Sequence, residues 1–196
     1  MTWRVLTQND VHNLTTPARV IEVGLDGFGI SRDAGLLTQD VSVCTAVALL
    51  PRDQGGECAL LHIYANPKLF PLGEDTIARH ARHLWHTFTE NLDTCAGYDA
   101  IVFGGQNGVM PAHSVSRIIS DTVFESVTHS GFVVSTDDRR FSSERGMQAV
   151  INPASREIAV AEDFHFYDMD ALDDAPRQAG RPLELKGAKK PSTFTI

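Results

Sequence analysis

Two short apolar runs in the middle of the chain are separated by a polar turn. The first run covers residues 44–50 and the second covers residues 58–63. The segment 51–56 between them, PRDQGG, is rich in residues that favour turns. This pattern predicts two neighbouring antiparallel strands joined by a loop. The start of the first strand would then lie beside the end of the second, which brings Cys44 close to His62.

Two longer stretches show helical spacing. Apolar side chains recur at three- and four-residue intervals over residues 76–92, which predicts a helix with one buried face. A second helix is predicted from Pro111 to about Ser130, and Gly131 is well placed to end it. Further strands are expected at 18–23, 98–103, 132–135, 147–151 and 156–161, with the last two joined by the turn Asn152-Pro153.

These elements predict one α+β domain, a mostly antiparallel sheet or sandwich with two main helices packed on it. The domain is expected to span residues 1–171. After that point the sequence is rich in Pro, Gly and Asp and loses its apolar periodicity. Residues 172–196 are therefore expected to form an extended or loosely ordered tail, loose on its own or lying across the domain surface.

The charge of the chain limits its partners. It carries 17 basic and 25 acidic residues, a formal net charge of −8. Because it has no basic stripe, we expect neither nucleic acid nor an anionic membrane as a main partner. No segment has the length of a membrane span or the pattern of a signal peptide, and three irregularly spaced cysteines make no disulfide framework. We expect a cytoplasmic protein without membrane insertion, with secretion by a route that leaves no N-terminal signal as the alternative.

A thiol beside an imidazole is the minimum requirement for nucleophilic catalysis by a thiolate, and Cys44 and His62 provide this pair. A free thiol has a pKa of about 8.5 and is only slightly ionised at neutral pH. A neighbouring imidazole accepts the thiol proton and later delivers it to a leaving group. Backbone N–H groups beside Cys44 are expected to stabilise the oxyanion that forms in such a reaction.

The remaining cysteines and a group of histidines have simpler interpretations. Cys58 and Cys95 are interpreted as packing residues. Cys58 shares the strand face of His62, so a resolving or metal-binding role is its alternative. We expect no metal site and no cofactor. Three histidines fan across the polar face of the first predicted helix and are interpreted as solvated: His80, His83 and His86.

Several segments form a longer pattern. They are ISRDAGLLT at 30–38, CTAVAL at 44–49, the glycine pair 55–56 with His62, FGG at 103–105, and RG at 145–146 with INP at 151–153. Together, over about residues 23–160, they resemble the CheD family of bacterial chemoreceptor glutamine deamidases. More distantly they resemble the catalytic domains of the cytotoxic necrotizing factors. The chain departs from the family at Val41-Ser42-Val43, where the family has leucine–glycine–serine, and at 141–144, where the family is rich in glycine.

The resemblance implies a cysteine-dependent hydrolase that converts glutamine side chains of a partner protein to glutamate through a thioester. Cys44 is the implied nucleophile, His62 the base and Thr38 the residue that orients the imidazole. The implied partner is a protein, either a chemoreceptor of bacterial chemotaxis or a host protein. The alternatives are a CheD-like regulator without catalysis and an effector deamidase, transglutaminase or ester hydrolase. Four residues are expected to bind the substrate: Val43, Thr45, Gly104 and Gly105.

Overall fold

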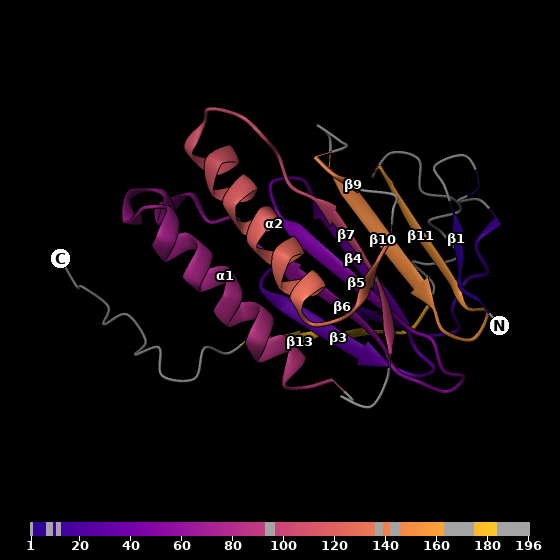
Figure 1. Ribbon diagram of the computed structural model, residues 1–196. Helices are drawn as coiled ribbons and strands as arrows, with labels where there is room; N and C mark the ends of the chain where they lie inside the picture. The colour runs from indigo at the N-terminus through magenta and orange to yellow at the C-terminus, as the bar shows by residue number, and fades with distance from the viewer. Residues whose placement is uncertain are drawn as a thin grey trace, which may run out of the picture.

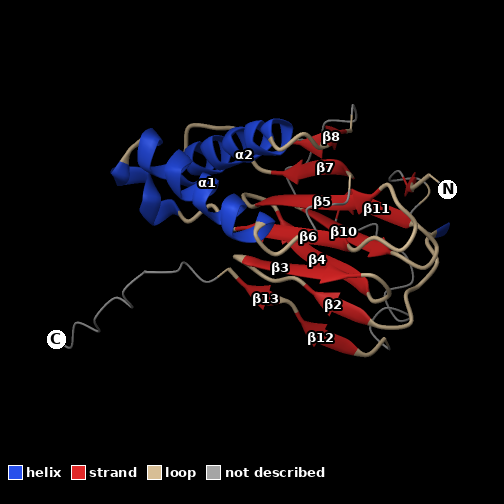
Figure 2. Cartoon of the chain, turned by 60° about the horizontal axis from the view of Figure 1, so that its bottom comes forward, coloured by secondary structure: helices blue, strands red, loops and turns tan. Residues whose placement is uncertain are grey.

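Two β-sheets and two helices form three layers in the structure, a computed structural model (Figure 1). It describes residues 2–6, 10, 13–92, 97–135, 139–141, 146–162 and 175–183. One sheet, here called the central sheet, lies between the helices and the other sheet, here called the outer sheet. Figure 2 shows the helices gathered on one side of the strands.

The outer sheet has the strand order β1-β11-β10-β4-β2-β12. Its strands are β1 (Arg4–Leu6), β11 (Glu157–Glu162), β10 (Met147–Asn152), β4 (Gly35–Val41), β2 (Val20–Glu22) and β12 (Arg177–Ala179). The hairpin of β10 and β11 is antiparallel, as the sequence predicts, and it runs from the pair Met147–Glu162 to the pair Asn152–Glu157. β4 lies beside β10 in antiparallel orientation and beside β2 in parallel orientation.

The central sheet has the order β13-β3-β6-β5-β7-β8, and β9 also pairs with β7. Its strands are β13 (Arg181–Pro182), β3 (Gly27–Ser31), β6 (Cys58–Ile63), β5 (Thr45–Pro51), β7 (Tyr98–Gly104), β8 (Val133–Val134) and β9 (Arg139–Arg140). The predicted pairing of the two apolar runs is confirmed, because β5 and β6 are antiparallel neighbours. The helical elements are α1 (Glu74–Thr89), α2 (Pro111–His129) and the short 3-10 helix η2 (Pro67–Leu72).

Side-chain alternation along β5 explains why this strand lies at the centre. Every residue of β5 is buried. Val47 and Leu49 point towards the helices, whereas Ala46 and Ala48 point towards the outer sheet. A strand that is covered on both faces is apolar throughout, which is why its sequence is a continuous run.

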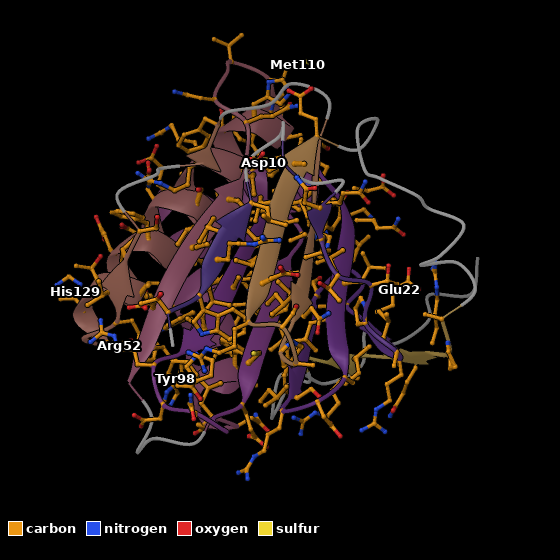
Figure 3. The ribbon with its side chains drawn as sticks, turned by 90° about the vertical axis from the view of Figure 1, so that its right-hand side faces the viewer. Asp10, Glu22, Arg52, Tyr98, Met110 and His129 are labelled. Atoms are coloured by element: carbon orange, nitrogen blue, oxygen red, sulfur yellow. The ribbon has the colours of Figure 1, made fainter. Side chains whose placement is uncertain are left out.

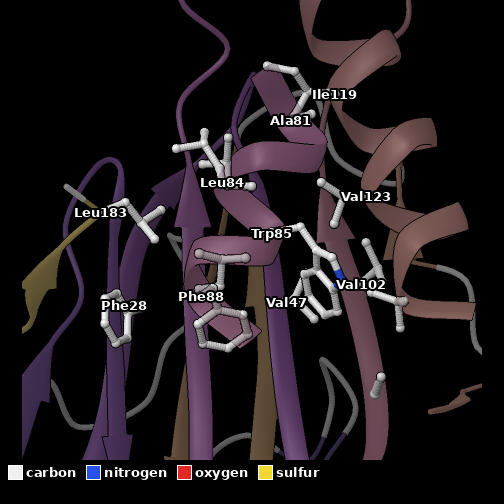
Figure 4. Packing of buried hydrophobic residues seen from close by; sticks show 14 of the residues in the cluster. Phe28, Val47, Ala81, Leu84, Trp85, Phe88, Val102, Ile119, Val123 and Leu183 are labelled. Atoms are coloured by element: carbon white, nitrogen blue, oxygen red, sulfur yellow. The ribbon is translucent and has the colours of Figure 1, made fainter. Parts of the chain in front are cut away.

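Aromatic side chains of α1 fill the space between the helices and the central sheet (Figure 4). Trp85 and Phe88 lie 5.6 Å apart between ring centroids, and Phe88 meets Phe28 of β3 edge-on at 5.8 Å. The predicted apolar stripe of this helix is confirmed, since its residues are buried. The helix ends at Thr89, three residues earlier than the sequence pattern indicates.

The predicted α+β class with two packed helices is confirmed, but the sheets are more complex than expected. Both sheets are mixed: β2–β4 and β1–β11 are parallel pairs of the outer sheet, and β7–β8 is a parallel pair of the central sheet. The chain passes from β2 in the outer sheet to β3 in the central sheet and back to β4. This crossing between the layers makes β2 and β4 parallel neighbours in one sheet.

The C-terminal segment that the structure describes, residues 175–183, crosses the open side of both sheets. β12 pairs with β2, and β13 pairs with β3. Leu183 reaches the core beneath the helices. Within the predicted tail of 172–196, this part lies on the domain surface as two edge strands, and the rest of the tail is outside the described residues.

Candidate active site

The three predicted catalytic residues lie at one end of the space between the sheets. In the β5–β6 ladder Ala46 is paired with His62, so Cys44, two residues before Ala46, is diagonal to the histidine. Diagonal neighbours in an antiparallel pair lie roughly 7 Å apart and within reach of longer side chains. Thr38 approaches from β4 in the facing sheet, on the same strand face as Leu36 of the inter-sheet core.

A short hydrogen-bond chain fixes the imidazole. The Thr38 hydroxyl donates to the backbone carbonyl of Val23 at 2.8 Å, and Thr38 Oγ1 lies 2.8 Å from His62 Nδ1. A hydroxyl has one proton, which the bond to Val23 uses. The contact with His62 therefore has Nδ1–H as its donor and Oγ1 as its acceptor. This assigns the proton of the neutral imidazole to Nδ1 and leaves Nε2 with a free lone pair.

His62 Nε2 is the unusual atom of the site. It is buried and has no hydrogen-bond partner among the described residues. Burial lowers the pKa of His62 to about 4, while the Val23 carbonyl and the charge of Asp40 act in the opposite direction. Buried polar atoms are normally hydrogen-bonded, and an orphan that persists calls for an explanation. A lone pair held ready to accept a proton is such an explanation.

Cys44 is closed off from solvent in this state. Only 3% of the residue is exposed. Burial raises the pKa of the Cys44 thiol to about 12; the backbone N–H of Ala65 lowers it, and the charges of Asp26 and Asp40 raise it further. The thiol and the imidazole are therefore both neutral at pH 7. A substrate therefore reaches Sγ only after the residues that cover it move.

This arrangement is suited to proton transfer that accompanies nucleophilic attack. A neutral thiol is a weak nucleophile and needs a base such as a neutral imidazole. In this structure His62 Nε2 makes no hydrogen bond with the Cys44 thiol. The surroundings are buried and mostly apolar, so an ion pair formed during a reaction would interact strongly. Thr38 contacts Nδ1 of the imidazole, the atom that a carboxylate or an asparagine contacts in known catalytic triads.

Gly104 and Gly105 support the backbone of Cys44. The N–H of Gly105 donates to the carbonyl of Cys44 at 2.7 Å. Both glycines have positive φ, 79° and 83°. A Cβ on Gly104 would lie 2.3 Å from Val41 Cγ1 and 2.6 Å from the Cys44 carbonyl oxygen, so only glycine fits there.

The other two predicted substrate-binding residues differ in orientation. Val43 is half-buried and packs against both apolar cores. Thr45 is fully buried, and by strand alternation its side chain points to the helix layer, away from the face of Cys44. Its hydroxyl has no hydrogen-bond partner among the described residues. Only the backbone of Thr45 therefore borders the nucleophile.

Sequence reasoning missed the residues that act on the site through charge or backbone. Asp26 and Asp40 are far apart in the chain, and both adopt left-handed φ angles, 48° and 57°. Such angles in non-glycine residues concentrate at functional sites and are not visible in sequence. The backbone groups of Val23 and Ala65 also leave no side-chain signature.

Of the other candidates, Cys58 lies away from this site, whereas His80 of α1 is near Asp26: burial lowers the pKa of His80 and the charge of Asp26 raises it. Cys58 is fully buried at the opposite end of the β5–β6 hairpin, next to a cavity of about 250 Å³ that Trp3 and Arg156 also line. Cys95 is outside the described residues. Along α1, His80 is half-buried, whereas His83 and His86 are exposed. The described part of the chain contains no cluster of potential metal ligands.

Comparison with known proteins adds no relative. No protein-family model matches the chain, and no curated protein matches it. Within the described residues, no helix has both the length and the apolar character needed to cross a membrane.

Proposed function

We propose that the protein is a cysteine-dependent protein-glutamine deamidase. The observation that carries the proposal is the hydrogen bonding of the His62 imidazole. Its Nδ1–H is bound to Thr38, and its Nε2 lone pair is unpaired in the inter-sheet space that Cys44 also faces. A packing histidine normally has both ring nitrogens satisfied. The likeness of segments 30–38, 44–49 and 103–105 to the CheD family supports the same reaction.

The reaction proceeds in two halves. In the first, Cys44 Sγ loses its proton to His62 Nε2 and attacks the carboxamide carbon of a substrate glutamine. The imidazolium then gives the proton to the amide nitrogen, and the C–N bond breaks. Ammonia departs, and the acyl group remains on Cys44 as a thioester. In the second half, water gives a proton to Nε2 and attacks the thioester. The C–S bond breaks, sulfur recovers its proton, and glutamate is released.

The partner follows from the same proposal. A protein side chain is the substrate, and a chemoreceptor or a host protein supplies it. The compartment that we propose is the cytoplasm, where free thiols stay reduced. The product carries a negative charge where the substrate was neutral, so the reaction changes the surface electrostatics of the partner.

A second candidate is a CheD-like regulator that binds its partner without turnover. It is favoured by the closure of Cys44, which is 3% exposed, and by the pKa of about 12 of its thiol. Under this alternative the His62–Thr38 bond is structural and Sγ never meets a substrate.

The discriminating experiment measures ammonia release and a mass gain of about 1 Da per converted glutamine on benzyloxycarbonyl-glutaminylglycine and on glutamine-rich test proteins. The proposal expects turnover by the wild type and by Cys58→Ser, and none by Cys44→Ser. Equal release by the wild type and Cys44→Ser would exclude a thiol mechanism. Absence of release from every substrate, together with failure of iodoacetamide to modify Cys44 in the folded protein, would favour the regulator.

A further inference from the structure

Exposed apolar side chains gather around the end of the sandwich that holds Cys44. Seven large apolar side chains are exposed in the described part of the chain, and five of them follow strand ends at this end. These five, here called the apolar rim, are Leu25, Phe70, Leu72, Val109 and Met110. Val109 is 98% exposed and Met110 is 61% exposed. Exposed apolar groups that gather in one region mark interaction sites.

Strand register places the rim at this end. β5 starts where β6 and β7 finish, because Thr45 is paired with both Ile63 and Gly104. η2 follows the end of β6, and residues 105–110 follow the end of β7. Leu25 precedes β3, whose first residue Gly27 is paired with His62. Figure 3 shows Met110 at the opposite end of the molecule from Arg52 and Tyr98.

Two carboxylates lie within the same region. Asp26 and Asp40 are the charged groups that act on the Cys44 thiol, and both are negative. Asp26 Oδ1 accepts a hydrogen bond from the N–H of Tyr64 at 2.9 Å, which holds it beside the end of β6. Asp40 is exposed, and its carboxylate has neither an ion pair nor a hydrogen bond with any residue that the structure describes.

We propose that this end of the sandwich docks a protein segment that carries its target glutamine beside lysine or arginine, with apolar residues further out. The inference rests on the proposed deamidase function and adds the class of substrate. The apolar rim supplies contact area, and the two carboxylates select for positive charge next to the nucleophile.

A cation of the bound segment near Asp26 and Asp40 would also offset the part of the raised Cys44 pKa that these two charges cause, which is smaller than the part caused by burial.

A membrane surface fits this end less well. Anionic headgroups would meet Asp26 and Asp40 and a chain whose net charge is −8. A protein segment with its own cations matches both the apolar and the charged parts of the surface.

The first test compares two acetylated, amidated peptides, Leu-Lys-Gln-Lys-Leu and Leu-Glu-Gln-Glu-Leu, as substrates. The wild type is expected to convert the lysine peptide with a kcat/KM about tenfold higher or more, since clefts of one charge raise the rate of encounter by at least this factor. Asp40→Asn keeps a residue that tolerates left-handed φ and is expected to reduce the preference to about twofold. Asp53→Asn, an exposed change at the other end, should leave it unchanged.

The second test removes the rim. Val109→Ser with Met110→Ser is expected to lower kcat/KM about tenfold for both peptides without changing their ratio. Val133→Ser is the matched control, because Val133 is 52% exposed and pairs with Asp99 near the start of β7, at the opposite end. An equal loss from the control would remove the rim from the docking surface.

A third test keeps this inference separate from the proposed function. Cys44 is alkylated in the folded protein with 2-bromoethylammonium, iodoacetamide and iodoacetate, and its modification is followed by peptide mass mapping. Relative to the rates on free cysteine, the cationic reagent should be favoured, and Asp40→Asn should reduce its advantage. If no peptide is hydrolysed, the deamidase function is rejected. The order of the alkylation rates then still tests whether this end of the sandwich prefers positive charge.

Two results would overturn the inference and leave the deamidase standing. One is equal conversion of the lysine and glutamate peptides by the wild type. The other is co-sedimentation with vesicles of phosphatidylcholine and phosphatidylglycerol that is lost in Val109→Ser with Met110→Ser, which would assign the rim to a membrane.

Discussion

Two cysteines at opposite ends of one hairpin show how little burial says about reactivity. Cys44 and Cys58 both face the space between the sheets, and both are nearly or fully inaccessible. Burial raises the pKa of each thiol to about 12. Neither solvent exposure nor the pKa of the thiol distinguishes the two cysteines.

Their neighbours differ. Cys44 has His62 diagonal to it, with the lone pair of Nε2 unpaired, and it follows a turn held by Gly105. Cys58 is the first residue of β6 and is paired with Ser31 of β3. Burial raises the pKa of its thiol, and the positive charge of Arg156 lowers it. The comparison teaches that the two thiols differ in their neighbours and not in their resting pKa, so the proposed role of Cys44 as a nucleophile depends on the nearby imidazole.

The strongest test of this comparison exchanges the two sulfurs one at a time. Cys44→Ser is expected to lower kcat for glutamine deamidation by about 1000-fold or more, because a hydroxyl at this site lacks the nucleophilicity of sulfur. Cys58→Ser is expected to change kcat by less than about threefold. Ammonia release under substrate saturation measures both. Similar losses in the two variants would remove the distinction between the two ends.

The two ends also differ in how tightly their glycines are held. Gly104 near Cys44 and Gly55 in the turn before Cys58 have nearly the same φ, 79° and 83°. A Cβ on Gly104 meets Val41 and Cys44, whereas a Cβ on Gly55 meets nothing within 4 Å. Gly104→Ala should lower the free energy of unfolding by more than about 3 kcal/mol, and Gly55→Ala by about 1 kcal/mol, the part due to φ alone.

Urea denaturation followed by circular dichroism measures this pair of variants. A loss below about 1 kcal/mol for Gly104→Ala would show that the nucleophile turn adapts to a side chain, contrary to a rigid support at this end.

The pH dependence of the free energy of unfolding measures the contribution of His62, the imidazole beside Cys44. The pKa of His62 is about 4 in the folded protein and 6.5 in the unfolded chain, so the unfolded state binds the extra proton as the pH falls. Stability is therefore highest above pH 6.5 and declines between pH 6.5 and 4, with about 3 kcal/mol of the decline due to His62.

Denaturation curves of the wild type and His62→Gln at several pH values between 7 and 4 give this contribution by difference. His83→Gln, a change on the exposed face of α1, serves as the control and should keep the wild-type slope. A slope for His62→Gln that matches the wild type would mean that the imidazole titrates normally and is not held neutral by burial.

Two threonines near Cys44 give the smallest contrast. The Thr38 hydroxyl bridges Val23 and His62, whereas the Thr45 hydroxyl is buried without a partner among the described residues. Thr38→Val should cost about 2 kcal/mol, because it leaves two buried polar groups unpaired. Thr45→Val should be neutral or stabilise the fold by up to about 1 kcal/mol.

Thermal unfolding of both variants measures this contrast, and Thr38→Ser should recover most of the loss because it restores the hydroxyl. Nitrogen-15 chemical shifts of His62 add a reading that stability does not give. They should report the Nδ1–H tautomer in the wild type and a mixture of tautomers in Thr38→Val.

The parts of the fold that follow from sequence are those whose side chains alternate or recur without interruption. The β5–β6 hairpin, α1 and α2 are visible because their apolar positions repeat over whole elements. β4 was missed although it carries Thr38, because it follows a turn and contains the polar pair Gln39-Asp40 near its end. β12 and β13 were missed because strands of three and two residues around a glycine have no periodicity to detect.

The site was predictable where side chains define it and not where the backbone does. Cys44, His62 and Thr38 are recognisable by residue type and spacing, and the structure brings Thr38 and His62 into contact at 2.8 Å. The acceptor for the Thr38 hydroxyl is a carbonyl, that of Val23, which any residue supplies. The charges of Asp26 and Asp40 converge on the thiol only after β2, β3 and β4 have been divided between two sheets.

The short strands β12 and β13 have a consequence for how copies of this chain behave toward one another. Each strand covers one edge of its sheet, β12 beside β2 and β13 beside β3. A chain that ended before residue 175 would leave β2 and the Gly27-Phe28 part of β3 without these partners, and open strand edges of this kind recruit other polypeptides. The C-terminal crossing thus doubles as protection against self-association.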